Sequence, residues 1–243
     1  MGDHLCIQGG FRGLCGLAAR DENVFASFRS HPAMVAIIEH VAPEQGEQYL
    51  SLLRQHAPDL LAPKIIKLLQ RFDAHGGGTP VDYGGGIQLT PNTLRYAWVH
   101  SRIRSHFGSQ FAKDHASKDR TIKNRGWAKG WKICEIGGGY GGQAALTLSL
   151  EPGVRDYALY DQVEPARLAK RFLGDHPVLR PKEGRTTPTV RTIGTPEGGM
   201  GSVAAAAEDG GPCDLVPTPG KHSLKHPPGY HCFWFHLFDM CIR

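Results

Sequence analysis

Residues 132–150, KICEIGGGYGGQAALTLSL, combine one acid and a run of glycines between an apolar segment and a helix-like one. A strand, a glycine-rich turn and a helix in this order form the first unit of a doubly wound nucleotide-binding fold. Glycines without side chains let a ligand touch the main chain, and the helix N-terminus adds a partial positive charge. This stretch is the first candidate for a binding site.

Two ligand-binding fingerprints fit residues 135–142. The dinucleotide pattern GxGxxG is satisfied by Gly137, Gly139 and Gly142, and the S-adenosylmethionine pattern ExGxGxG by Glu135, Gly137, Gly139 and Gly141. A carboxylate at the strand end would repel the pyrophosphate of a dinucleotide, whereas it would attract the ammonium and sulfonium groups of S-adenosylmethionine. Glu135 therefore favours the methyl donor, with a dinucleotide or a purely structural turn as alternatives.

A second acid, Asp161, follows 26 residues after Glu135. DYALYDQVEPARLAKRFL predicts a strand that ends at Asp161 and a helix around residues 165–173. An acid at the end of the second strand can accept the ribose hydroxyls of the cofactor, or it can cap the following helix.

Other polar clusters carry weaker signals. The glycine-rich segment before residue 90 contains His75, Asp82 and Tyr83, which are candidates for the base that removes an acceptor proton; the segment is either a substrate lid or a surface connection. The basic run at 112–130 is expected to be a connector rather than a nucleic-acid site. Histidines and cysteines of the last 27 residues match no standard zinc spacing, so we expect no metal site.

Helices are predicted before the glycine loop. Apolar residues recur at helical spacing across residues 21–73, including HPAMVAIIEHV. Thr90 and Pro91 resemble an N-cap and first helical residue, and predict a helix to about His106. After residue 173 the chain is rich in Gly, Pro and Thr, which predicts loops, with CDLV at 213–216 as a further strand.

Composition narrows the class of protein. Forty per cent hydrophobic and 21 per cent charged residues fit a globular chain with a core, and a net charge of +5 is too small to indicate nucleic-acid binding. Six scattered cysteines without a CxxC pair, no secretory signal and no membrane-length apolar run predict a cytoplasmic protein.

Four segments of the chain, in this order, resemble the sugar O-methyltransferases that depend on S-adenosylmethionine. They are FASFRSHPAMVAIIEHV, GTPVDYGGGIQLTPNTLRYAW, ICEIGGGYGGQA and YALYDQVEPARL. The resemblance covers about residues 24–173. It implies a Rossmann-like methyltransferase domain of class α/β behind a helical N-terminal region, and methyl transfer to a hydroxyl of a sugar or glycan acceptor. Glu135, Gly137, Gly139 and Gly141 would hold the methionine part of the cofactor and Asp161 the ribose, with Gly138, Tyr140 and Gln162 completing the expected site.

The expected organisation is an extension (1–20), a helical region for acceptor selection (21–111), the connector (112–130), a partial methyltransferase domain (131–216) and an atypical tail (217–243). The tail departs from the family pattern, which suggests a truncated or altered C-terminus. Two other functions therefore stay open: a non-catalytic remnant of such an enzyme, and an NAD(P)-dependent oxidoreductase.

Overall fold

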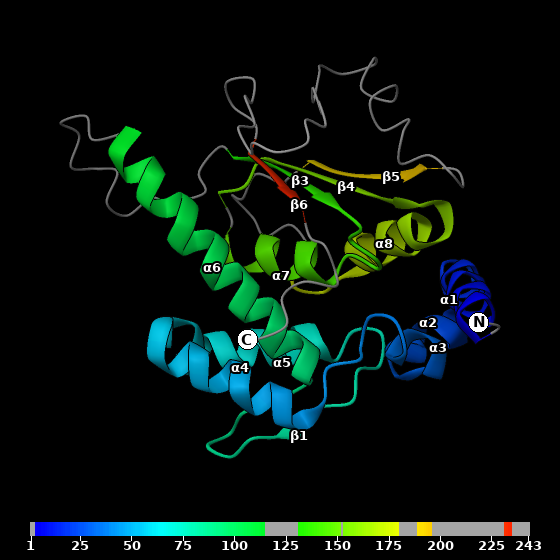
Figure 1. The fold of residues 1–243 in the computed structure, drawn as a ribbon, viewed down its shortest axis with the longest axis horizontal. Helices are drawn as coiled ribbons and strands as arrows, with labels where there is room; N and C mark the ends of the chain where they lie inside the picture. Colours follow the sequence, from blue (N-terminus) through cyan, green and yellow to red (C-terminus); the bar gives the residue numbers. More distant parts are fainter. Residues whose placement is uncertain (1–2, 115–130, 152, 180–188, 196–230, 235–243) are drawn as a thin grey trace.

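The computed structural model describes residues 3–114, 131–151, 153–179, 189–195 and 231–234. These residues form a mixed α/β structure in layers: a parallel sheet, two helices on one of its faces, and a group of N-terminal helices packed beneath them (Figure 1). No helix within these ranges is long and apolar enough to cross a membrane.

The N-terminal part is helical, as predicted for residues 21–73. It contains α1 (Asp3–Ala18), α2 (Glu22–Ser27), α3 (Pro32–Val35), α4 (Pro43–His56) and α5 (Pro63–Asp73), with 3-10 turns at Phe28–Ser30 and Pro58–Leu61. Three of these helices have proline at their first turn, where a missing N–H costs no hydrogen bond. The helical interpretation of residues 36–41 is wrong, since α3 ends at Val35 and the chain turns there.

A hairpin and a long helix follow. Strands β1 (Val81–Asp82) and β2 (Gln88–Leu89) pair antiparallel, and α6 runs from Pro91 to Asp114, beyond the predicted end near His106. The predicted cap is confirmed, because the Thr93 amide donates to Thr90 Oγ1 at 3.2 Å. The basic connector lies outside the described residues from 115 onward.

The sheet contains the two predicted strands and two more. Strands β3 (Lys132–Ile136) and β4 (Asp156–Gln162) alternate with α7 (Gly142–Leu150) and α8 (Val163–Asp175), and all four were expected. The prediction of loops after residue 173 is wrong for β5 (Thr189–Thr195), which pairs parallel with β4. Strand β6 (His231–Trp234), in the part expected to be an atypical tail, pairs parallel with β3. The expected strand at 213–216 lies outside the described residues.

The strand order is β5-β4-β3-β6, so the chain moves outward from β3 and then returns to the other side of it. This reversal makes the carboxyl end of β3 a topological switch point, where neighbouring connections diverge and open parallel sheets form a crevice. Helices α7 and α8 lie on the face of the sheet turned toward the N-terminal helices (Figure 1).

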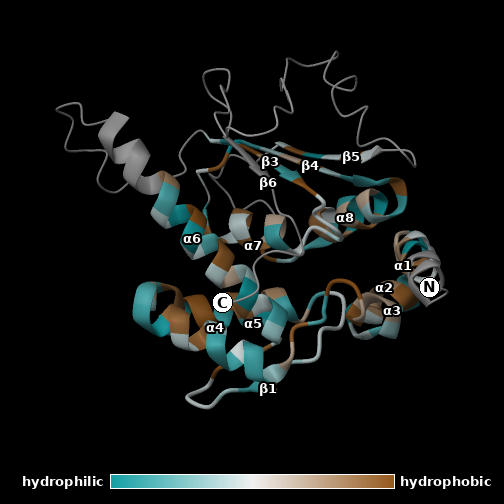
Figure 2. Cartoon of the chain, viewed as in Figure 1, coloured by the Kyte–Doolittle hydropathy of each residue, from teal (hydrophilic) through white to brown (hydrophobic). Residues whose placement is uncertain are grey.

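One hydrophobic core joins the layers. It includes Leu50 and Leu53 of α4, Leu69 of α5, Leu146 of α7 and Leu159 of β4, all of them almost inaccessible to solvent. In Figure 2, α4 and α8 each carry both hydrophobic and hydrophilic residues, as expected for helices that cover a core. The N-terminal helices and the sheet therefore fold onto one another.

An aromatic cluster within this core contains two histidines. His176 is fully buried after the end of α8, stacks on Phe72 with ring centroids 5.2 Å apart, and meets His75 at 4.7 Å. Burial, with smaller contributions from His75 and Arg29, lowers the pKa of His176 to about 3. The folded protein therefore keeps this imidazole neutral, because a charged ring there would lose its hydration.

We expect His176→Phe to reduce the sensitivity of the fold to acid. The unfolded chain protonates His176 near its usual pKa while the folded chain does not, so stability falls as the pH decreases from about 6.5 toward 3. Between pH 7 and 5 the wild type should lose about 2 kcal/mol more than the variant, measured by urea unfolding at each pH. Parallel pH profiles of the two proteins would show that this histidine does not titrate as described.

Candidate functional site

The glycine loop joins β3 to α7 at the switch point. Gly137, Gly139 and Gly141 have φ angles of 75°, 57° and 86°, in the left-handed region that favours glycine. These three are the glycines of ExGxGxG. Gly142, the last glycine of the dinucleotide pattern, is the first residue of α7 and has no positive φ.

The glycines are also required by contacts with the protein itself. A Cβ atom on Gly138 would lie 2.7 Å from Leu159 side-chain atoms, one on Gly139 would lie 2.4 Å from Ile38 Cδ1, and one on Gly142 would lie 2.7 Å from the Tyr96 ring. All of these distances are shorter than real Cβ contacts. The turn after α3 and the first part of α6 therefore pack directly on the loop.

Glu135 lies beneath the loop. Its side chain is 3% exposed, accepts a hydrogen bond from Tyr157 Oη at 2.9 Å, and has its Cδ 3.1 Å from the position of a Cβ on Gly138. Burial raises the pKa of Glu135 to about 7; the hydrogen bond from Tyr157 opposes this shift and the charge of Asp161 adds to it. The side chain consequently exchanges its proton near neutral pH.

Asp161, at the end of β4, lies beside the same loop. Its carboxylate accepts hydrogen bonds from the amide of Gly139 at 2.6 Å and from the amide of Gln162 at 2.7 Å. Burial raises the pKa of Asp161, and these two hydrogen bonds partly offset the shift. Gln162 is exposed and is the N-cap residue of α8, without a capping side-chain hydrogen bond. The carboxyl ends of two adjacent parallel strands thus bring two acids to one loop.

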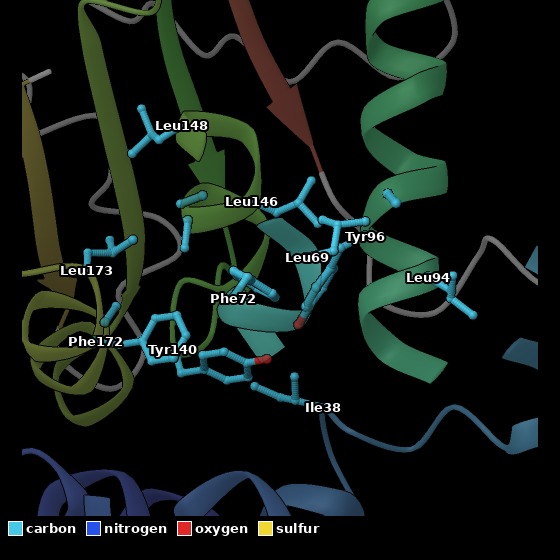
Figure 3. Close-up of a cluster of buried hydrophobic side chains, with 14 of the residues drawn as sticks. Ile38, Leu69, Phe72, Leu94, Tyr96, Tyr140, Leu146, Leu148, Phe172 and Leu173 are labelled. Carbon is cyan, nitrogen blue, oxygen red and sulfur yellow. The ribbon is translucent and has the colours of Figure 1, made fainter. Parts of the chain in front are cut away.

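Tyr140, the one side chain inside the glycine run, points into the protein. It is completely buried, packs edge-on against Phe172 with centroids 4.9 Å apart, and lies between Phe172 and Ile38 in Figure 3. Burial raises the pKa of Tyr140 well above its usual range, so its hydroxyl stays protonated and donates to Glu39 Oε1 at 2.6 Å. Tyr140 anchors the loop rather than facing an open ligand site.

Glu39 belongs to a buried charge network centred on Arg29. The Arg29 side chain is 0% exposed; its Nε donates to Glu39 at 2.7 Å, and its Nη2 donates to Asp73 Oδ1 at 3.0 Å. The Asp73 carboxylate also accepts hydrogen bonds from Thr90 and Thr93 at the start of α6. This network, the Arg29 cluster (Arg29, Glu39, Asp73), links α5, α6 and the turn after α3 to the glycine loop.

The three candidate bases are not brought to the loop. His75 lies in the aromatic cluster against Phe172. Asp82 is exposed in the hairpin and accepts from the Gly84 amide at 2.8 Å, while Tyr83 Oη donates to the Pro43 carbonyl at 3.4 Å. The hairpin lies on the side of the helical layer away from the sheet (Figure 1). The segment contains two glycine triplets, at 76–78 and 84–86. The first packs against residues 26–29, and the second forms the open tip of the hairpin.

The residues that hold the loop from the N-terminal region were not predicted from the sequence. Ile38, Glu39 and Tyr96 contact it, and Arg29 supports it through Glu39. The available signal was a charged residue inside an apolar run, in IIEHV, which contains Ile38 and Glu39. Within the described ranges, no three His, Cys, Asp or Glu side chains gather into a possible metal site; most of the tail histidines lie outside those ranges.

Comparisons of the chain with family models, curated proteins and solved structures found no match.

We expect Glu39 and Tyr140 to be energetically coupled. Glu39→Gln leaves the buried Arg29 with one carboxylate and should cost about 3 kcal/mol, while Tyr140→Phe removes one hydrogen bond and should cost about 1 kcal/mol. Glu39→Gln removes the charge from the acceptor of the hydrogen bond that Tyr140→Phe deletes, so the two changes act on one interaction and the double variant should lose less than the sum of the two, by about 0.5 kcal/mol or more. Urea unfolding of the four proteins measures this coupling.

The matched control is Glu47→Gln. Glu47 pairs with Arg54 at 3.2 Å, but both side chains are more than half exposed, at 55% and 52%. An exposed pair of this kind contributes little, so this variant should lose less than about 0.5 kcal/mol. Strictly additive effects of the Glu39 and Tyr140 changes would contradict the described network.

Proposed function

We propose that the protein is an S-adenosylmethionine-dependent O-methyltransferase that methylates a hydroxyl of a sugar or glycan. In this proposal, the sheet with α7 and α8 is a Rossmann-like methyltransferase domain, and the cofactor lies over the β3–α7 loop. The observation that carries it is the pair of acids, Glu135 beneath and Asp161 beside a loop whose three left-handed glycines are those of ExGxGxG. The sugar acceptor rests on the sequence resemblance alone.

The electrostatics of the loop support a cationic ligand over a diphosphate. Glu135 and Asp161 both have raised pKa values. The negative charge of Asp161 contributes to the raised pKa of Glu135, so the two acids repel each other. A sulfonium or ammonium group would relieve that repulsion, whereas the pyrophosphate of NAD(P) would increase it. The position of Asp161 at the end of the second strand is compatible with ribose binding, a role shared by both cofactor classes.

The proposed reaction is an in-line displacement. The acceptor oxygen attacks the methyl carbon, the carbon–sulfur bond breaks, the sulfonium becomes a neutral thioether, and the hydroxyl proton passes to a base or to water. The protein contributes mainly by positioning the two substrates and excluding water. None of His75, Asp82 and Tyr83 is proposed as the base, because His75 packs within the aromatic cluster and Asp82 and Tyr83 lie in the hairpin.

We expect the protein to bind S-adenosylhomocysteine and S-adenosylmethionine, but neither NADH nor NADPH, in calorimetric titrations. Gly139→Ala should reduce S-adenosylhomocysteine affinity at least tenfold, since Gly139 has a positive φ, contacts Ile38 and donates to Asp161. Asp161→Asn keeps the shape of the side chain and should weaken binding by about tenfold.

Gly84→Ala is the control for backbone strain. Gly84 also has a positive φ, 75°, but a Cβ there would meet nothing within 4 Å. This variant should lose about 1 kcal/mol of stability and keep its cofactor affinity. Saturable binding of NADH to the wild type, or folded wild type that binds none of the four ligands, would overturn the proposal in favour of the oxidoreductase or the remnant, respectively.

Cofactor affinity should also depend on pH through Glu135. As the pH rises through about 7, this side chain ionises and gains attraction for the sulfonium group. The affinity for S-adenosylmethionine should therefore rise about fivefold or more between pH 5.5 and 7.5, and Glu135→Gln should flatten that profile. Equal pH profiles of wild type and variant would assign the dependence to other groups.

A further inference from the structure

A hollow is lined by residues of α1, of the turn after it and of α8. Helix α1 lies on the side of α8 that faces away from the sheet (Figure 1). The hollow has a volume of about 900 Å³, within the range of small-molecule sites. Its lining residues, which we call the α1–α8 groove, are Arg12, Gly13, Gly16, Ala19, Arg20, Glu164, Arg167, Lys170, Arg171, Gly174 and Asp175. None of them belongs to the glycine loop.

The groove exists because the α1 wall is made of small residues. Gly13 and Gly16 are three residues apart on α1 and therefore lie close to one face of the helix, and Ala19 follows in the turn directly after it. A Cβ on Gly13 or on Gly174 would meet no heavy atom within 4 Å. The space beside both glycines is thus left open by the protein.

Five basic side chains and only two acids line this space. Both acids are already engaged: Glu164 accepts two hydrogen bonds from Arg12, at 3.1 and 3.0 Å, and Asp175 lies 3.6 Å from Arg171. Arg171 also pairs with Glu22. The remaining cations, Arg20, Arg167 and Lys170, are exposed and form no ion pair with any residue in the described parts of the chain.

The paired arginines fix the two walls. Arg12 joins α1 to the first turn of α8, and Arg171 donates to the carbonyls of Ala18 and Asp21 at 3.0 and 3.1 Å while lying over the Phe25 ring at 4.2 Å. The helices are therefore held at both ends of the groove. Arg167 and Lys170 project from α8 and Arg20 from the turn after α1, so only their side chains have to be ordered when they converge on a ligand.

We infer that the α1–α8 groove binds the phosphate group of a small phosphorylated molecule. Guanidinium groups donate paired hydrogen bonds to phosphate oxygens, and two arginines with one lysine can neutralise a dianion. A neutral sugar would leave these charges unmatched, and a sulfonium compound would be repelled. The groove and the acidic loop therefore have opposite charge preferences, and this inference does not depend on the proposed methyl transfer.

The test uses inorganic phosphate and pyrophosphate as probes, added to the full chain at constant ionic strength, with chloride as the reference anion. Saturable binding in calorimetric titrations and a rise in unfolding temperature are expected, with pyrophosphate tighter than phosphate. The double variant Arg167→Gln/Lys170→Gln should weaken pyrophosphate binding at least about tenfold, since two charge-assisted hydrogen-bond donors are lost.

The matched control is Lys64→Gln/Lys67→Gln. These lysines have the same three-residue spacing on α5 and are also exposed, but they lie outside the groove. This control should bind pyrophosphate like the wild type. Equal loss of affinity in both double variants would reduce the effect to general surface charge and overturn the inference.

A second variant blocks the space without removing any charge. Gly13→Gln fills open space, and replacing a glycine within α1 should favour the helix. We expect unchanged or higher thermal stability together with at least about a tenfold loss of pyrophosphate affinity. Undiminished binding in this variant, or wild-type binding that does not saturate, would contradict a site in the groove; tighter binding of an oligonucleotide than of pyrophosphate would replace it with a nucleic-acid surface.

Discussion

The fold depends on one guanidinium group that has no contact with water. Arg29 is stable inside the protein only because Glu39, Asp73 and main-chain carbonyls surround it, and the loss of one carboxylate would leave an uncompensated buried charge. Its partners come from different segments, and Glu39 also accepts a hydrogen bond from Tyr140 of the glycine loop. The N-terminal helices are therefore part of the structure that shapes the glycine loop, whatever ligand the loop binds.

The glycine loop has two physical requirements that act on the same residues. Positive φ angles demand glycine at Gly137, Gly139 and Gly141, and close approach of the Leu159 and Ile38 side chains demands it at Gly138 and again at Gly139. Packing thus explains much of the bare main chain without a ligand. Charge is the property that separates the ligand classes, because two neighbouring acids with raised pKa values favour a cation.

The sequence predicted those elements whose signals are local. Strands β3 and β4, helices α7 and α8 and the cap at Thr90 follow from apolar runs, glycines and a capping residue. Strand β5 is rich in threonine, and β6 lies in a stretch without family resemblance; both form because a neighbouring strand supplies their hydrogen bonds. Helix α1 contains glycines that disfavour a helix, and its packing on α8 compensates. The acids of the site were predicted, but the tertiary contacts of Tyr140 could not be.

During synthesis, β3 is made before its neighbour β6. Strand β3 emerges from the ribosome long before β6, so the main-chain groups of one edge of β3 have no partner strand until the last described segment arrives. A nascent or proteolysed chain that stops before His231 would expose this edge to strands of other molecules. Strand β6 covers this edge of β3 once it pairs, and β6 then becomes an edge of the described sheet itself.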